Sequence, residues 1–196
     1  MMDIVFASHN GGKVKEIAHL LHRDDIHLLT LADVHLHDLN VDETGTTYED
    51  NAWLKAKTIG DKTRHVTLAD DSGIEVQALG NRPGVFSARY GKGSDLDRCK
   101  KLLKELEGKQ DRSAKFVAVL VYYDPTSNTR KVFRGEVKGI IAPDIMGDSG
   151  FGYDPIFIPE GYHQTMAELG TDVKNEISHR ARAVHAFKTW WESAVV

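Results

Sequence analysis

Near its start the sequence reads Asp3-Ile-Val-Phe-Ala-Ser-His-Asn-Gly-Gly-Lys-Val-Lys15. Residues 3–7 are rich in β-branched and aromatic side chains and predict a short buried strand. From Val14 onward the apolar residues recur at helical spacing, so the chain is expected to turn through residues 8–12 into a helix. The first turn of a helix offers backbone N–H groups and a positive dipole end, which together with Lys13 suit a phosphate group. An ordinary strand-to-helix turn that binds nothing is the alternative reading of this stretch.

The common phosphate-binding motifs do not fit this loop. A Walker A loop requires glycine where the chain has Ala7, and serine or threonine where it has Val14. The dinucleotide fingerprint G-x-G-x-x-G is absent as well. A phosphate site here would therefore belong to neither class.

Composition limits the classes of protein to be considered. The chain has 196 residues, 41% of them apolar and 28% charged, as in soluble globular proteins of one domain, with or without two lobes. No apolar run approaches the roughly 20 residues that span a bilayer, and the N-terminus lacks the features of an export signal. A single cysteine, Cys99, fits a reducing cytoplasm, and its place on an apolar helical stripe predicts a buried structural thiol. The net charge of −4 argues against a broad nucleic-acid surface.

Acidic residues follow a second strand. Residues 65–69 predict a buried strand that ends at Asp70-Asp71-Ser72-Gly73, and residues 74–79 predict another strand. Ligands of open α/β sheets bind at the carboxyl ends of strands, where one aspartate could face the site while its neighbour points to the opposite side. A simple Asp-Ser-Gly turn explains the same residues equally well.

A helix is expected to begin between the strand at residues 3–7 and the strand at residues 65–69. Thr46 with Glu49, or Thr47 with Asp50, forms a capping box, and Asn51 and Lys55 share one face of the helix that follows. Glu43 precedes this helix in a loop, where a carboxylate gains a role only if another acidic group faces it.

The second half of the chain is more β-rich. Residues 114–123 and 129–137 predict a hairpin, and a second lobe is expected at roughly 113–160 within one domain that spans residues 1–196. The sequence then reads Gly147-Asp-Ser-Gly-Phe-Gly-Tyr-Asp154. Glycine lets a backbone approach a flat ligand and an aromatic ring supplies a stacking face, although a purely structural glycine turn is the alternative.

Together, in this order, these stretches resemble one family, the inosine triphosphate pyrophosphatase-like enzymes, which act on non-canonical purine nucleoside triphosphates. The resemblance covers essentially the whole chain. It departs from the family pattern at Ser8, Tyr48, Asp50, Gly91-Lys-Gly93 and Ala181. The matching stretches are Ser8-His-Asn-Gly-Gly-Lys13, Glu43-Thr-Gly-Thr-Thr-Tyr-Glu-Asp-Asn-Ala52, Leu54-Lys-Ala56, Ala69-Asp-Asp-Ser-Gly73, Pro83-Gly-Val-Phe-Ser-Ala-Arg-Tyr90, Gly150-Phe-Gly-Tyr-Asp-Pro-Ile-Phe157 and Ile177-Ser-His-Arg180.

The resemblance implies an α/β fold with a long mixed central sheet, flanking helices, and two lobes with a nucleotide cleft between them. It also implies a homodimer and hydrolysis of ITP, dITP and XTP to the nucleoside monophosphate and pyrophosphate, which removes deaminated purines from the nucleotide pool. A nucleoside triphosphate carries about four negative charges, so Mg²⁺ is the expected cofactor.

The resemblance also implies a role for individual residues. Asp71 is the expected base for the attacking water, Lys55 stabilises charge on the phosphates, and Glu43 with Asp71 is expected to hold the metal. The phosphates are expected to contact Ser8, His9, Asn10, Gly11, Gly12, Lys13 and Ser72. The base is expected to contact Phe151, Gly152, Tyr153, Asp154, Lys174, His179 and Arg180, with Arg180 donating to the 6-oxo group that distinguishes hypoxanthine and xanthine from adenine.

Two other functions remain open on sequence grounds. One is a Maf-like pyrophosphatase that acts on dTTP or modified pyrimidine nucleotides, which a panel of substrates separates from the first reading. The other is a nucleotide-binding sensor without catalysis, from which loss of the carboxylates would be expected; Glu43, Asp70 and Asp71 are all present.

Overall fold

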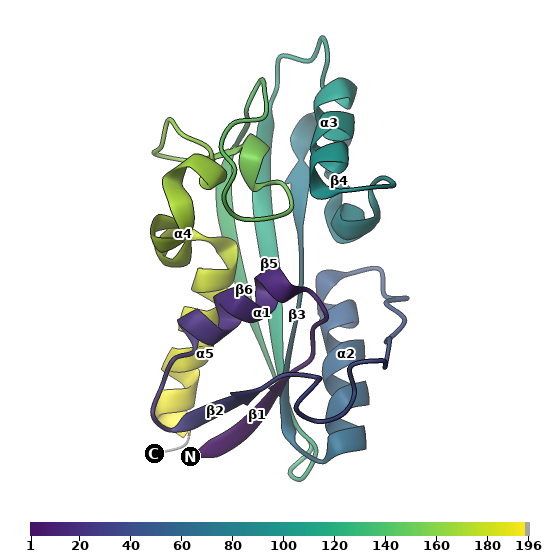
Figure 1. The fold of residues 1–196 in the computed structure, drawn as a ribbon, viewed down its shortest axis with the longest axis vertical. Coiled ribbons are helices and arrows are strands. Elements are labelled where there is room, and N and C mark those ends of the chain that lie inside the picture. Colours follow the sequence, from purple (N-terminus) through teal and green to yellow (C-terminus); the bar gives the residue numbers. More distant parts are fainter. Residues whose placement is uncertain (195–196) are drawn as a thin grey trace. The chain divides into compact units, whose positions relative to one another are not determined.

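A computed structural model describes residues 1–194, which form a mixed seven-stranded sheet flanked by helices (Figure 1). The strand order is β2-β1-β3-β5-β6-β7, with β4 paired to β3. β1 runs parallel to β2 and β3, whereas the β3–β4 and β6–β7 pairs are antiparallel. The α/β class with a mixed sheet is therefore confirmed. The strands are β1 (Met2–Phe6), β2 (Ile26–Leu29), β3 (Val66–Val76), β4 (Arg82–Pro83), β5 (Ser113–Asp124), β6 (Thr129–Ile141) and β7 (Phe157–Pro159).

Side-chain caps mark the start of two helices, and one of these caps is the predicted one at Thr47. The Thr47 hydroxyl accepts from the Asp50 N–H, and Ser94 forms a reciprocal capping box with Asp97. None of the helices in the described part of the chain combines the length and the apolar character needed to cross a membrane. The helices are α1 (Gly11–Leu20), α2 (Tyr48–Thr63), α3 (Asp95–Glu105), α4 (Met166–Ile177) and α5 (His179–Ala194), with short 3₁₀ helices at Gln77–Leu79, Gly84–Arg89 and Asp154–Ile156.

The chain forms two compact units. Unit 1 contains residues 1–71, 118–135 and 182 to the C-terminal end of α5, and unit 2 contains residues 72–117 and 136–181. Strands β3, β5 and β6 each contribute residues to both units. The expected lobe at roughly 113–160 stays a prediction.

Unit 1 buries both faces of its part of the sheet. On one face Phe6, Leu68 and Leu120 pack with Ile17 of α1 and Phe187 of α5. On the other face α2 lies so close to β5 that a Cβ at Gly60 would stand 2.7 Å from the Tyr123 ring. Because helices cover both faces, β5 reads as a nearly continuous apolar run instead of an alternating one.

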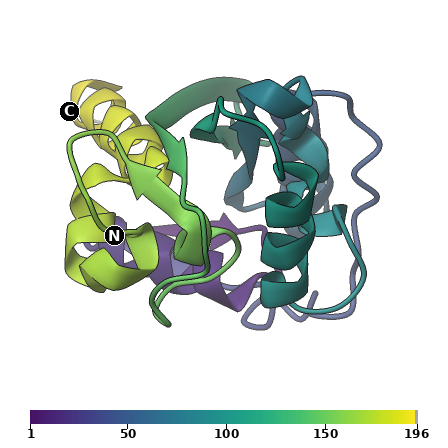
Figure 2. The ribbon, with the colours of Figure 1, turned by 90° about the horizontal axis from the view of Figure 1, so that it is seen from above.

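Unit 2 has its own apolar core. Ile74 of β3 and Phe116 of β5 pack with Leu102 of α3, Phe157 of β7 and Met166, the first residue of α4. In Figure 2 the green loop of residues 142–153 lies between α3 and α4. Side chains and backbone of this loop contact both helices, so its shape is set from two sides.

One prediction, the turn within residues 65–79, is wrong. The sequence was expected to end a strand at Asp70-Asp71, turn at Ser72-Gly73 and start a second strand, whereas β3 is continuous over Val66–Val76. The strand continues because polar groups of both its side chains and its backbone are hydrogen-bonded. The Asn51 amide donates to the Asp71 carboxylate, and the backbone N–H of Ile74 donates to the Ser87 hydroxyl at 2.9 Å. The two aspartates therefore lie within a strand and not at its carboxyl end.

The aromatic cluster of unit 1 should dominate its stability. Phe187 is fully buried, with its ring centroid 5.5 Å from that of Phe133 and 5.6 Å from that of Trp191. Phe187→Ala should lower the free energy of unfolding by about 3–5 kcal/mol in urea titrations, because the cavity adds to the lost transfer energy. Val132→Ala, at a position that is 38% exposed, should change it by less than about 0.5 kcal/mol. Similar losses in the two variants would contradict this account of the core.

Candidate functional site

The loop after β1 prepares the start of α1. Asn10 caps the helix, with its side-chain oxygen accepting the Lys13 N–H at 3.1 Å, and the Ser8 hydroxyl accepts the Asn10 N–H at 3.2 Å. A Cβ placed on Gly11 would meet nothing within 4 Å, so space is open beside the first turn. The exposed His9 forms a hydrogen bond between its Nε2 and the Leu39 carbonyl at 2.8 Å, which connects this loop to residues further along the chain. The N-terminal end of α1 is thus open to an anion.

Two neighbouring aspartates of β3 lie in the buried interior of unit 1. Asp70 is 1% exposed and Asp71 is 6% exposed. Because adjacent strand residues point to opposite faces, they meet different partners. Lys13 of α1 lies 3.2 Å from Asp70 Oδ2, and the Asn51 amide of α2 donates to Asp71 Oδ2 at 3.1 Å. The prediction that the two carboxylates face opposite sides is confirmed.

Asp71 belongs to a group of charges that we call the carboxylate–lysine cluster: Lys13, Glu43, Lys55, Asp70 and Asp71. Lys55 Nζ lies 2.5 Å from Glu43 Oε1. Burial raises the pKa of Asp71, and the charge of Glu43 raises it further, while Lys55, Lys13 and the Asn51 hydrogen bond act in the opposite direction. One acidic group and two basic groups therefore act on one buried carboxylate.

Asn51 is a site residue that the sequence did not single out. It is fully buried, and its amide joins two parts of the cluster: Nδ2 donates to Asp71, while Oδ1 accepts the Gly45 N–H at 2.8 Å. Gly45 lies two residues after Glu43, so Asn51 joins Asp71 to the loop that carries Glu43. Its place four residues before Lys55, on the same face of α2, was the available signal.

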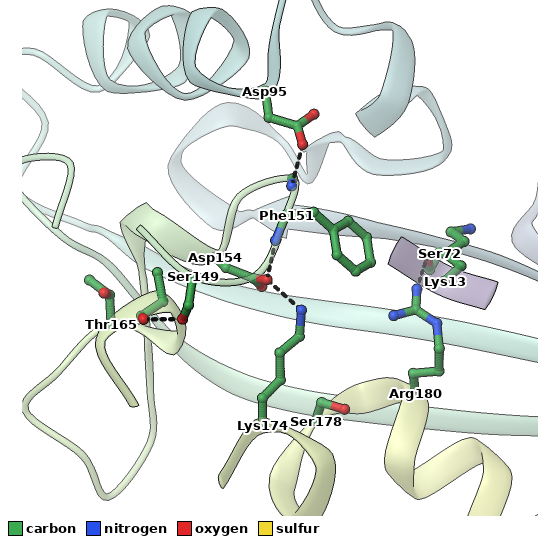
Figure 3. Close-up of polar contacts among 12 residues, drawn as sticks. Lys13, Ser72, Asp95, Ser149, Phe151, Asp154, Thr165, Lys174, Ser178 and Arg180 are labelled. Carbon is green, nitrogen blue, oxygen red and sulfur yellow. Dashed lines mark hydrogen bonds and ion pairs between the residues drawn. The ribbon is translucent and has the colours of Figure 1, made fainter. Parts of the chain in front are cut away.

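Unit 2 holds a second group, the aromatic–cation cluster: Ser72, Phe151, Asp154, Lys174 and Arg180 (Figure 3). Lys174 Nζ lies 4.3 Å from the centroid of the Phe151 ring and forms an ion pair with Asp154. Arg180 Cζ lies 5.6 Å from the same centroid, and its guanidinium donates to the Ser72 hydroxyl at 3.0 Å. Lys174, Arg180 and Asp154 are all less than 4% exposed, whereas Phe151 is half-buried. One aromatic ring is therefore flanked by two buried cations.

Two residues predicted to contact a base lie in the packed interior of unit 2. The Tyr153 ring belongs to the apolar core, and its hydroxyl donates to the Ser87 carbonyl at 2.8 Å. The His179 ring stacks on Phe116, with centroids 4.7 Å apart and planes 10° apart. Burial raises the pKa of Tyr153, in keeping with a packed position. Of the two aromatic side chains in the glycine-rich loop, Phe151 is the more accessible.

A groove of about 620 Å³ lies elsewhere on unit 2. Its lining includes Glu75, Lys115, Ile140 and Tyr162. Lys115 lies 3.4 Å from Glu75 and 3.3 Å from Glu136, so the cation is neutralised locally. Among residues 1–194, those predicted for the site do not line this groove.

Comparisons with known proteins agree with this architecture. A model of the Ham1 family matches residues 4–190. A dITP/XTP pyrophosphatase of Bacillus licheniformis is 45% identical over 188 residues, covering 94% of this chain and 95% of that protein. A dITP/XTP pyrophosphatase of Bacillus subtilis is 42% identical, with 94% of each chain covered.

Solved structures of Ham1 proteins are also similar to this chain. The Ham1 protein of Staphylococcus aureus superposes with a TM-score of 0.87 at 39% identity, covering 97% of this chain and 98% of that one. A Ham1 protein of Coxiella burnetii gives a TM-score of 0.90 at 37% identity, covering 99% and 100%. The resemblance seen in the sequence motifs is confirmed over the full length, and the chain belongs to the Ham1 family.

Proposed function

We propose that this protein hydrolyses non-canonical purine nucleoside triphosphates, namely ITP, dITP and XTP, to the nucleoside monophosphate and pyrophosphate. The observation that carries the proposal is the carboxylate–lysine cluster around the buried Asp71, in a chain more than 40% identical to proteins named dITP/XTP pyrophosphatases. The cluster combines a candidate base with cations that suit phosphates. Such a set fits hydrolysis better than binding alone.

Asp71 is the proposed base. It takes a proton from the water whose oxygen bonds to the α-phosphorus, while the bond from that phosphorus to the bridging oxygen breaks and pyrophosphate leaves. Burial and the charge of Glu43 raise the pKa of Asp71, and perturbed carboxylates of this kind are common among catalytic groups. Asn51 holds the carboxylate through Oδ2 during the reaction.

The phosphates are proposed to contact the N-terminal end of α1. Ser8, His9, Asn10, Gly11, Gly12 and Lys13 form this loop and first helical turn, and Ser72 and Lys55 provide further polar contacts. Helix N–H groups and lysine charge both favour an anion. Lys13 and Lys55 are paired with carboxylates, so the triphosphate would compete for these cations. The two lysines would then stabilise the charge that develops on pyrophosphate.

Mg²⁺ is the proposed cofactor, held by Glu43 and Asp71. The residues fit: both groups are hard oxygen donors, and Glu43 lies close enough to raise the pKa of Asp71. Within residues 1–194 no group of three or more His, Cys, Asp or Glu side chains is arranged to hold a metal. Two carboxylates leave room for substrate phosphates and water, which Mg²⁺ commonly keeps as ligands. When bound, the cation would neutralise phosphate charge.

The base is proposed to stack on Phe151. Arg180 would donate to the 6-oxo group, and Ser72 holds its guanidinium. Lys174 supplies a second cation beside the ring, and Asp154 orients it. Gly152 lets the backbone approach the base, while Tyr153 and His179 support the loop and α5 from the core. Adenine carries a 6-amino donor and would leave the Arg180 donor without an acceptor.

We further propose a homodimer in the cytoplasm. The dimer rests on the resemblance to inosine triphosphate pyrophosphatase-like enzymes. The location is supported by the single cysteine, which is fully buried as expected.

The reaction is tested by pyrophosphate release across ITP, dITP, XTP, GTP, ATP and dTTP with Mg²⁺. Turnover of ITP, dITP and XTP should exceed that of ATP by about 10- to 100-fold, as expected for one buried polar mismatch. A chelator should stop the reaction. Preference for dTTP would support the Maf-like alternative and contradict the proposed base recognition, and binding without turnover would support the sensor.

Replacement of the proposed base separates activity from stability. Asp71→Asn should lower kcat roughly 100- to 10,000-fold, because the amide cannot accept the proton, while ITP should still bind. The same change should leave the melting temperature equal or higher, because it removes the cost of burying a charged carboxylate whose pKa is raised. The exposed Asp24→Asn is the matched control and should behave as wild type. A near-normal kcat for Asp71→Asn would refute the assignment.

A further inference from the structure

Helix α3 holds the glycine next to Phe151 by both of its backbone polar groups. The Gly152 N–H donates to Asp95 Oδ2 at 2.7 Å (Figure 3). One turn further along the helix, the Cys99 thiol donates to the Gly152 carbonyl, with Sγ and the oxygen 3.4 Å apart. The Phe151 N–H is held independently by Asp154 Oδ2 at 2.9 Å. Carboxylates therefore fix the N–H groups of two successive residues, one of which carries the accessible ring.

The acceptor Asp95 and the donor Cys99 on α3 are themselves held in place. Asp95 is the first residue of the helix and forms an ion pair with Arg98. Cys99 is fully buried, and burial raises its pKa to about 12, so its thiol keeps the proton that it donates at neutral pH. This explains how a buried cysteine contributes beyond packing.

Gly152 needs such support. Its φ of +66° is a conformation that glycine adopts easily but does not prefer strongly, so the backbone alone does not hold it. Gly150, on the other side of Phe151, also has a positive φ of +79°. Without outside contacts a loop flanked by two such residues would sample many positions, and the Phe151 ring would move with it.

We propose that Asp95, with Cys99, is a positioning residue that fixes the Phe151 ring beside Lys174 and Arg180 and thereby sets discrimination between purine bases. The inference rests on the proposed function, because it assumes that Phe151 stacks on the base. It assigns to the first turn of α3 a role in specificity without contact to the substrate. Looser placement of the ring would weaken base binding equally in the ground state and the transition state, so KM should change and kcat should not.

The test compares three variants by kinetics and by hydrogen exchange of the Gly152 amide. Asp95→Ala removes the acceptor. Asp95→Asn keeps an oxygen that can accept the same hydrogen bond. Asp97→Ala is the matched control, because Asp97 caps the same helix turn through Ser94 and thus reports the effect of a weakened helix start.

Asp95→Ala should speed exchange at Gly152, raise KM for ITP about tenfold, as expected for a lost hydrogen bond to a charged group, and leave kcat within about twofold. Its preference for ITP over ATP should fall. Asp95→Asn should restore most of the KM, and Asp97→Ala should lower the melting temperature with KM unchanged. Cys99→Ala should show a smaller change in the direction of Asp95→Ala, and Cys99→Ser, which retains a donor, should stay closer to wild type.

Faster Gly152 exchange with an unchanged KM would overturn the positioning role while the proposed function stands. An equal rise in KM in Asp97→Ala would also overturn it, since the cause would then be the helix start. A wild-type protein that hydrolyses none of the nucleotides would overturn the proposed function and the specificity role together.

Discussion

Two adjacent carboxylates buried in one strand impose the strongest constraint on unit 1. A buried charge is costly unless it is paired and hydrogen-bonded, and Asp70 and Asp71 point to opposite faces of β3. Asp70 is therefore paired with Lys13 of α1 on one face, and Asp71 accepts a hydrogen bond from Asn51 of α2 on the other. The same helices bury the apolar faces of the sheet, so packing and charge pairing place them together. Burial raises the pKa of Asp71 in spite of the charges of Lys55 and Lys13, and perturbed carboxylates of this kind are common at functional sites.

Unit 2 meets a different constraint, which is the placement of one aromatic ring on a glycine-rich loop. A Cβ at Gly150 would come within 2.2 Å of Asp154 Oδ2, so the loop closes tightly over that carboxylate. Asp154 in turn joins the Phe151 backbone to Lys174. Gly150 is thus needed for close approach of the backbone to the buried Asp154, a reason that the sequence alone did not reveal. Freedom of the loop is limited from outside by α3 and α4.

Much of this could be predicted from local signals. The turn into α1, the caps at Thr47 and Ser94 and the buried β5 follow from propensity and spacing, which act over a few residues. The predicted turn at Ser72-Gly73 was wrong. These two residues have the composition of a turn, but β3 stays extended there through partners that are distant in the chain, such as Ser87. The sequence did not identify Tyr153 as a core residue for the same reason, because its hydroxyl donates to the carbonyl of Ser87, which is distant in the chain. Asn51 was visible as a neighbour of Lys55, but its bridge between Asp71 and the Glu43 loop depends on tertiary structure.

The central claim is that water attacks the α-phosphorus of the nucleoside triphosphate. Hydrolysis of ITP in water enriched in ¹⁸O tests this directly, because the attacked phosphorus keeps the label. We predict that mass spectrometry will find one ¹⁸O atom in inosine monophosphate and none in pyrophosphate. Label in the pyrophosphate, or release of inorganic phosphate together with labelled inosine diphosphate, would place the attack on another phosphorus and contradict the account.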